Sequence, residues 1–403
     1  MKNLEYLSIT ELSEAIRDQK VSPVEVVGAC LARIESLNPK LNAFITVLAD
    51  EARADAKAAE ADIKAGKYRG PLHGIPVAFK DMYDTAGIKT TAAFQFFANR
   101  VPKKDAVAVT KLKDAGAIIV GKTNMHTLAM GTTSQVSIFG PVHNPWNDAY
   151  ISGGSSGGSA VAVAAGMCFA TIDTDAIGST RLPASCCGVV GFKCTWGLMD
   201  NTGILDGEQA DEMILKLATV GIMTRDVADT ALVADVLAGN SFTKALQSKK
   251  QMQRVGVVSN FGATPKIREL FDAAASEIKK LGYDLTDVAA PFSENPDMQG
   301  VDKARETADK DIFKDADVLI LPTTASEVLT TKAVGEDPQA LSPQNTFFVN
   351  YYGLPAISVP CGFDADGLPV GLQIVGKKDA DAAVMQVAQA YQHATKWHEK
   401  HPA

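Results

Sequence analysis

Serines in two glycine-rich turns, together with a lysine upstream of them, are the residues of this chain whose types and spacing could do chemistry. Ser155 and Ser156 stand in the run GGSSGG, and Ser179 stands in TDAIGSTRLPA. Lys80 ends the apolar segment of HGIPVAFKD. A serine hydroxyl becomes a good nucleophile only when a base removes its proton. A lysine can be that base only when burial lowers its pKa from about 10.4.

Two other motifs compete with this interpretation. GGSSGG contains the GxSxG nucleophile-elbow pattern twice, but an elbow needs a preceding strand and a later Asp and His. The turn-rich HNPWND precedes the run, and the later histidines fall in a polar C-terminal segment, at His393, His398 and His401. A Ser-His-Asp hydrolase and a plain flexible loop both stay open. GAIIVGKT at 116–123 fits the P-loop pattern, but its middle residues form an apolar strand rather than a phosphate-binding loop, so we reject nucleotide binding.

The elements that must position these residues alternate between strand and helix from about residue 70. Short β-branched runs are found at 75–79, 117–120, 254–258, 318–321, 357–359 and 372–375, with helical patterns at 105–115, 266–281 and 380–394. This alternation predicts an α/β fold with a mixed, largely parallel central sheet covered by helices on both faces. A helix of small residues, 159–166, separates the two serine turns and suits close packing.

The chain is predicted to form one domain, 1–403, in three parts. The N-terminal part, about 1–68, is helical: capping boxes pair Ser8 with Glu11 and Ser22 with Glu25, and a charged helix follows at about 50–65. A catalytic core occupies about 69–240 and a C-terminal α/β part about 253–400. The polar, turn-like stretch 241–252 between them is short for a domain linker.

Composition excludes several classes of function. With 46% hydrophobic and 21% charged residues, the 403-residue chain is ordinary for a globular protein. A net charge of −8 without Lys/Arg runs gives no reason to expect nucleic acid or an anionic membrane as partner. The start, MKNLEYLSITELSE, does not read as a secretory signal, and the six cysteines form no CxxC pair, so we expect a cytoplasmic protein. A homodimer is possible.

Seven long motifs, in order over nearly the whole chain, make this sequence resemble the amidase signature family. They are GIPVAFKD, GKTNMHTLAMG, FGPVHNPWN, GGSSGGSA, TDAIGSTRLPA, GLPAISVPCGF and GLPVGLQIVG. The resemblance implies a Ser–Ser–Lys triad, with Ser179 as nucleophile, Ser155 as proton relay and Lys80 as base. It also implies a cis peptide before the relay serine, at Gly154–Ser155. No metal and no cofactor is expected.

The turn that carries Ser179 is predicted to bind the tetrahedral oxyanion, because such an intermediate needs preorganised donors. The candidate donors are the backbone N–H groups of Ala176, Ile177, Gly178 and Ser179. Further residues expected beside the substrate are Gly131, Thr132 and Ser156.

Several other side chains are expected to support the site rather than react. Asp175 and Arg181 flank the turn, either as a pair that holds it or as independent surface charges. Gln373 falls in the last C-terminal motif and Asn350 lies just before GLPAISVPCGF, and both are expected to support the site. The aromatic cluster of Phe94, Phe96 and Phe97 either lines an acyl pocket or fills core.

Departures from the family pattern lie at or beside the expected substrate pocket. Ile177 replaces a usual glycine, Ala176 a usual threonine and Thr127 a usual glutamate, and the region 291–315 is shorter than the family's helical insert. The leading hypothesis is hydrolysis of a small carboxamide, urea or carbamate. The alternatives are a glutaminase-type subunit of an amidotransferase, disfavoured by Ile177 and the short insert, and a catalytically silent scaffold, disfavoured by the intact triad.

Overall fold

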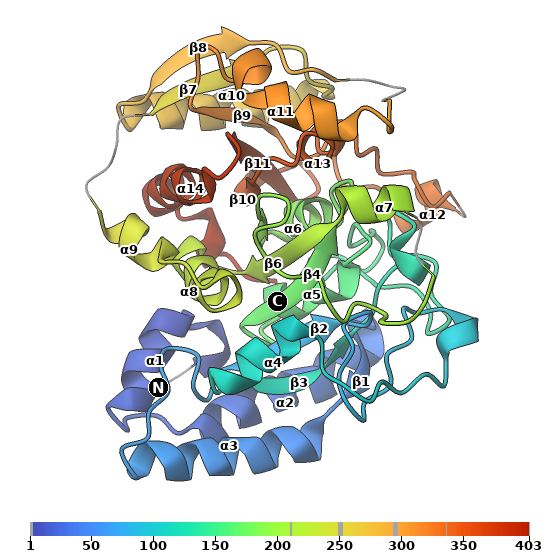
Figure 1. The fold of residues 1–403 in the computed structure, drawn as a ribbon, viewed down its shortest axis with the longest axis vertical. Helices are drawn as coiled ribbons and strands as arrows, with labels where there is room; N and C mark the ends of the chain where they lie inside the picture. The colour runs from blue at the N-terminus through green and yellow to red at the C-terminus, as the bar shows by residue number, and fades with distance from the viewer. Residues whose placement is uncertain (1–2, 210–211, 249–252, 293–296, 336, 403) are drawn as a thin grey trace.

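The computed structural model describes residues 3–209, 212–248, 253–292, 297–335 and 337–402. Eleven strands of these residues form one sheet, in the order β1-β3-β2-β4-β6-β5-β10-β11-β9-β7-β8, which runs from bottom to top of Figure 1. The strands are β1 Phe44–Val47, β2 Pro76–Lys80, β3 Ile118–Thr123, β4 Ala170–Asp175, β5 Val190–Lys193, β6 Thr219–Thr224, β7 Arg254–Val258, β8 Asp284–Val288, β9 Val318–Pro322, β10 Ala356–Phe363 and β11 Pro369–Gly376.

Helices cover both faces of this sheet. The α-helices are α1 Ile9–Arg17, α2 Pro23–Leu41, α3 Ala49–Lys64, α4 Val107–Asp114, α5 Gly157–Ala164, α6 Arg181–Cys187, α7 Glu212–Leu217, α8 Val227–Ala238, α9 Phe242–Gln247, α10 Pro265–Lys280, α11 Val301–Ile312, α12 Thr331–Val334, α13 Phe347–Tyr351 and α14 Asp381–Thr395. Short 3₁₀ segments are η1 Leu4–Tyr6, η2 Gln95–Phe97, η3 Thr127–Ala129 and η4 Trp397–Glu399.

Alternate residues of β2 point into two separate hydrophobic clusters, as expected when both faces of a strand are buried. Val77 and Phe79 belong to one cluster, and Ala78 belongs to another that includes the small residues of α5. The predicted mixed α/β class, with helices on both faces, is therefore confirmed. None of the described helices is long and apolar enough to cross a membrane.

The expectation of a largely parallel sheet needs correction. Of the ten strand pairings that the structure describes, four are parallel, β2–β3, β2–β4, β7–β8 and β7–β9, and six are antiparallel. Five of the six antiparallel pairs are consecutive in the middle of the sheet, from β4 to β9, and the sixth joins β1 to β3 at one edge. Among them, β10 and β11 follow one another in the chain without an intervening helix, which an antiparallel pair allows and a parallel pair does not.

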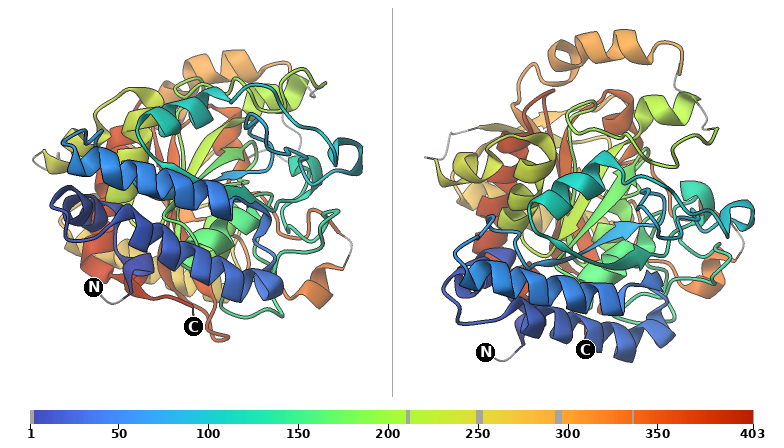
Figure 2. Two further views of the ribbon diagram at one scale, coloured as in Figure 1. Left: turned by 90° about the horizontal axis from the view of Figure 1, so that it is seen from below. Right: turned by 60° about the horizontal axis from the view of Figure 1, so that its bottom comes forward.

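The N-terminal part is a layer of helices under the sheet, with α2 and α3 side by side at the bottom of Figure 1 and in both views of Figure 2. Both predicted capping boxes form, at Ser8 with Glu11 and at Ser22 with Glu25. The part is not wholly helical, because β1 joins the sheet by pairing with β3. Segments near the two ends of the chain lie side by side, since the rings of Tyr6 and His401 stack with centroids 4.1 Å apart.

One sheet runs through all three predicted parts of the chain. The core supplies β2 to β6, the C-terminal part supplies β7 to β11, and the antiparallel pairing of β5 with β10 joins them. This continuity favours the single-domain prediction. In the polar stretch 241–252, residues 242–247 form α9 rather than a turn, and residues 249–252 lie outside the described part of the chain.

Candidate active site

Lys80 ends β2 inside the protein and is fully buried. Its Nζ donates to Ser155 Oγ at 2.6 Å and to Thr174 Oγ1 at 3.1 Å. Burial lowers the pKa of Lys80 to about 8, although the carboxylates of Asp173 and Asp175 act in the opposite direction. A substantial fraction of this amine is thus neutral near pH 8, as a general base requires.

Two other lysines, Lys122 and Lys193, are as deeply buried, and burial also lowers their pKa to about 8. Their partners differ from those of Lys80. Lys122 donates to the carbonyl of Tyr83 and the hydroxyl of Thr90, and Lys193 donates to two backbone carbonyls. A carbonyl only accepts, whereas both partners of Lys80 are hydroxyls that can also donate a proton. Lys80 is therefore placed to exchange protons with two hydroxyls, whereas Lys193 holds backbone carbonyls and Lys122 also lies 3.7 Å from the buried carboxylate of Asp81.

Lys122 also explains why the P-loop pattern forms no phosphate-binding loop. It lies within β3, whose residues Ile118–Thr123 are all buried, and not in a loop with free N–H groups. The rejection of nucleotide binding at this motif is consistent with that position.

Ser155 lies in the turn before α5, after a cis peptide bond between Gly154 and Ser155. Its carbonyl accepts from the N–H of His126 at 2.9 Å and from Ser134 Oγ at 3.2 Å. Gly158, at the start of the helix, has no room for a side chain, since a Cβ there would lie 2.4 Å from the carbonyl oxygens of Ala43 and Asn124. Close backbone packing therefore fixes the turn that presents the Ser155 hydroxyl to Lys80.

Ser179 lies in the turn between β4 and α6 and is 4% exposed. Its carbonyl accepts from the N–H of Ser156 at 3.2 Å, which ties this turn directly to the Ser155 turn. Gly178 has φ +128°, and a Cβ on it would meet Thr346 Oγ1 at 2.3 Å, so only glycine suits this position. The fold thus brings both predicted serines and Lys80 into one buried region.

Asp175 and Arg181 form a buried ion pair with two contacts, Nη2 to Oδ1 at 2.8 Å and Nε to Oδ2 at 3.0 Å. Burial alone would raise the pKa of Asp175, but the charge and hydrogen bonds of Arg181 outweigh burial and lower it. The carboxylate also accepts from the N–H of Gly178 at 2.8 Å and that of Thr180 at 3.2 Å. Of the two interpretations of these charges, the structure favours the pair that holds the turn.

Residues of the C-terminal part also contact Arg181. Its guanidinium donates to Asn350 Oδ1 and Gln373 Oε1, both at 2.5 Å, and to the carbonyl of Thr346 at 3.1 Å. Thr346 Oγ1 in turn donates to the carbonyl of Ile177 at 2.6 Å. Sequence reasoning placed Asn350 and Gln373 in support of the site, but it missed Thr346, which lies outside the recognised motifs.

The candidate oxyanion donors divide into two groups. The N–H of Gly178 donates to Asp175 Oδ1 at 2.8 Å, so this amide is engaged in the structure and its role as an oxyanion donor stays a prediction. The N–H groups of Ala176, Ile177 and Ser179 have no acceptor among the described residues. Three of the four candidate amides therefore stay available to a ligand oxygen.

The other predicted substrate-side residues lie in the same region. A Cβ on Gly131 would lie 2.2 Å from the His126 ring, next to Ser155. Thr132 is buried, and its N–H donates to the carbonyl of Pro338 at 2.7 Å. Ser156 is buried, and its hydroxyl has no partner among the described residues. Gly131 and Ser156 thus flank the Ser155 turn, whereas Thr132 binds a loop near α12.

The aromatic cluster is mostly at the surface, and Phe97 packs against a small core cluster of Ala92, Ala93 and Met125. Phe96 is 80% exposed, and Phe94 and Phe97 are half-buried beside it with ring centroids 5.7 Å apart.

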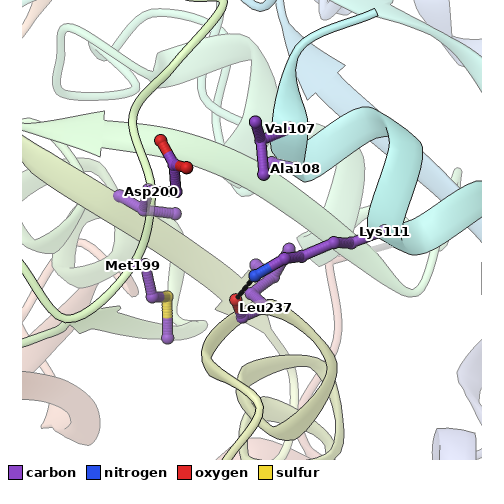
Figure 3. Close-up of a pocket in the computed structure, with 7 residues that line it drawn as sticks. Val107, Ala108, Lys111, Met199, Asp200 and Leu237 are labelled. Atoms are coloured by element: carbon purple, nitrogen blue, oxygen red, sulfur yellow. Dashed lines mark hydrogen bonds between the residues drawn. The ribbon is translucent and has the colours of Figure 1, made fainter.

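A separate pocket between α4 and α8, shown in Figure 3, contains none of the predicted site residues. There Lys111 Nζ donates to the carbonyl of Leu237 at the end of α8 at 2.6 Å.

Comparison with known proteins identifies the class of this fold and site. The sequence model of the family described as Amidase matches residues 25–298 and 298–385. The chain belongs to this amidase family, and it is an enzyme of the amidase type, which acts on carbon–nitrogen bonds.

Its relatives in sequence and in structure carry different names. The chain is 33% identical to the A subunit of glutamyl-tRNA(Gln) amidotransferase from Geobacter metallireducens, over 97% of this chain and 98% of the relative. It is 32% identical to the same protein of Synechococcus sp. strain CC9605, over 96% of each chain. A solved 6-aminohexanoate cyclic dimer hydrolase matches with TM-score 0.86 and 25% identity over 99% of both chains. A bacterial aryl acylamidase matches with TM-score 0.85 and 25% identity, over 98% of this chain and 97% of that one.

The alignments with relatives also indicate where this chain is shorter than they are. The first alignment runs over 481 residues although this chain has 403, and the two family matches meet at residue 298. That position lies within the region 291–315 predicted to be short. Residues 293–296 of this region lie outside the described part of the chain, and α11 occupies most of the remainder.

Proposed function

We propose that this protein hydrolyses a small carboxamide, or a related urea or carbamate, through an acyl-enzyme on Ser179. The observation that carries the proposal is the buried contact of Lys80 Nζ with Ser155 Oγ at 2.6 Å, next to a turn in which Ser179 and unengaged amides lie together. The lowered pKa of Lys80 supports its role as base.

In this mechanism Ser179 Oγ attacks the carbonyl carbon of the substrate. Its proton passes to Ser155, whose own proton passes to Lys80 Nζ. The N–H groups of Ala176, Ile177 and Ser179 stabilise the oxyanion. The carbon–nitrogen bond then breaks, and the proton returns from Lys80 through Ser155 to the leaving nitrogen. Water attacks the acyl-enzyme by the same route, which releases the carboxylic acid and restores Ser179.

A second candidate, a glutaminase-type subunit, is favoured by the sequence relatives, which are named as the A subunit of an amidotransferase. Such a subunit would hydrolyse glutamine for a partner protein. The replacement of a usual glycine by Ile177 and the shortening at residue 298 weigh against it.

The test measures ammonia release by the purified chain without any added protein. A panel of simple carboxamides, with L-glutamine as one member, is compared between the wild type and Ser179→Ala. We expect turnover of a simple carboxamide that Ser179→Ala abolishes. Turnover of glutamine and of no other panel member would favour the second candidate. Absence of turnover of every panel member, together with absence of covalent labelling of Ser179 by a fluorophosphonate, would favour a silent scaffold.

A further inference from the structure

Asp173 is a buried carboxylate that the mechanism above does not use. It lies in β4, one residue before Thr174, and is fully buried. Its Oδ2 accepts from Thr171 Oγ1 at 2.7 Å, whereas its Oδ1 accepts no hydrogen bond within 3.5 Å from the described residues, although the hydroxyls of Ser156 and Ser159 are close enough to lower the pKa of Asp173. A buried carboxylate with an unpartnered oxygen is costly unless a nearby charge compensates it.

The strand register places Lys80 next to Asp173. In the parallel pair of β2 and β4, Ala78 lies opposite Thr171 and Phe79 opposite Ile172, so the next positions, Lys80 and Asp173, share the face of Ala78 and Thr171. Burial raises the pKa of Asp173 to about 6, and Lys80 acts against this rise, as do the hydroxyls of Ser159, Thr171 and Ser156. These three hydroxyls are neutral groups. The other titratable groups whose pKa the charge of Asp173 raises are Tyr83 and Cys168, and burial raises the pKa of both as well. Among the groups that Asp173 faces, Lys80 is thus the one that can carry positive charge.

Lys80 in turn faces three titratable groups, Asp173, Asp175 and His126. Asp175 is already neutralised by its ion pair with Arg181. Burial, with a contribution from Lys80, lowers the pKa of His126 to about 4, so this ring is neutral when the enzyme works. Asp173 forms no ion pair with any described residue. It is therefore the carboxylate left free to respond when Lys80 becomes charged.

We propose that Asp173 is a positioning residue for Lys80, whose carboxylate stabilises the ammonium that forms when Lys80 receives the proton from Ser155. This inference rests on the proposed function. No bond other than O–H and N–H bonds changes: a neutral amine beside a carboxylate becomes an ammonium beside a carboxylate. Without the negative charge, the amine would release its proton more easily and would be a weaker base for Ser155.

The test uses the rate of Ser179 labelling by a fluorophosphonate as a function of pH, which needs no knowledge of the substrate. In Asp173→Asn the acidic limb of the profile is expected to move to lower pH by about 0.5–1 unit, and the plateau rate to fall several-fold. Asp173→Ser is a second neutral variant with a smaller side chain, should the amide not fit. Circular dichroism establishes that each variant is folded.

The matched control is Asp381→Asn, which alters another buried carboxylate that accepts from Thr195 N–H and Oγ1 at 2.8 and 2.6 Å. Its profile is expected to keep the wild-type limb. The inference would be overturned if folded Asp173→Asn and Asp173→Ser kept the acidic limb at the wild-type pH. It would also be overturned if Asp381→Asn moved the limb by the same amount. If the wild type is not labelled at all, the proposed function fails instead, and the two failures are thereby distinguished.

Discussion

At the scale of single residues, the chemistry of a lysine's partners separates Lys80 from the other buried lysines. The sequence pointed to Lys80 through its motif, but it could not reveal that Lys122 and Lys193 are equally buried. Charged residues are rarely buried without a partner, and the carbonyls of Tyr83 and Leu354 that hold these two come from distant parts of the chain. Only the assembled fold shows that Lys80 alone among the three contacts two hydroxyls.

The ionisation of Lys80 sets the expected pH dependence. Burial lowers its pKa from the ordinary value to about 8, and the neutral amine is the reactive form. Labelling by a fluorophosphonate should therefore rise about tenfold per pH unit below that value and level off above it. Lys80→Met should lose most of the rate together with this limb. A rate profile that Lys80→Met leaves unchanged would show that another group is the base.

Ile177 is expected to restrict the acyl side of the pocket, because its amide is a candidate oxyanion donor and its Cβ starts close to the reacting carbonyl. Its carbonyl is held by Thr346, and its side chain is half-buried. Ile177→Gly should admit amides branched next to the carbonyl and should lower the rate for unbranched ones modestly, since glycine loosens the turn. The measurement is kcat/KM for a matched pair of amides. A specificity ratio that does not move towards the branched amide contradicts this role.

At the scale of elements, sequence patterns revealed six of the eleven described strands and missed β1, β4, β5, β6 and β8. The six predicted runs correspond to β2, β3, β7, β9, β10 and β11, and the predicted helices to α3, α4, α5, α10 and α14. β4 was missed because Thr171, Asp173 and Asp175 interrupt its apolar pattern, and all three are fully buried. Because these polar residues lie beside the site, the functional part of β4 is also the part that a search for apolar runs does not recognise.

The contact of α13 with the Ser179 turn gives a prediction at this scale. Thr346, directly before α13, donates to the carbonyl of Ile177 at 2.6 Å. Thr346→Val keeps the shape but removes this bond, so it should slow labelling about tenfold or more, whereas Thr346→Ser should restore most of the rate. Thr264→Val removes the N-cap of α10, away from the site, and serves as control. It should cost about 1 kcal/mol of stability and leave labelling unchanged. Equal labelling rates in the two valine variants would contradict the role of Thr346.

At the scale of the whole molecule, the site depends on both halves of the sheet. Arg181 from the core contacts Asn350 and Gln373 from the C-terminal part, and β5 pairs with β10. The core and the C-terminal part should therefore unfold together. In urea, the loss of fluorescence from Trp146, Trp196 and Trp397, the loss of far-UV circular dichroism and the loss of fluorophosphonate labelling should share one midpoint. Loss of labelling at a clearly lower urea concentration, while much of the fluorescence and circular dichroism remains, would indicate separate units.

The covalent intermediate is the central claim, and mass mapping of the labelled protein tests it most directly. The purified wild type is treated with a fluorophosphonate, digested and analysed by tandem mass spectrometry, in parallel with Ser179→Ala and Ser156→Ala. We predict a single adduct on Ser179 in the wild type, no adduct in Ser179→Ala, and an adduct still on Ser179 in Ser156→Ala. An adduct on Ser155 or Ser156, or labelling that persists in Ser179→Ala, would contradict this claim.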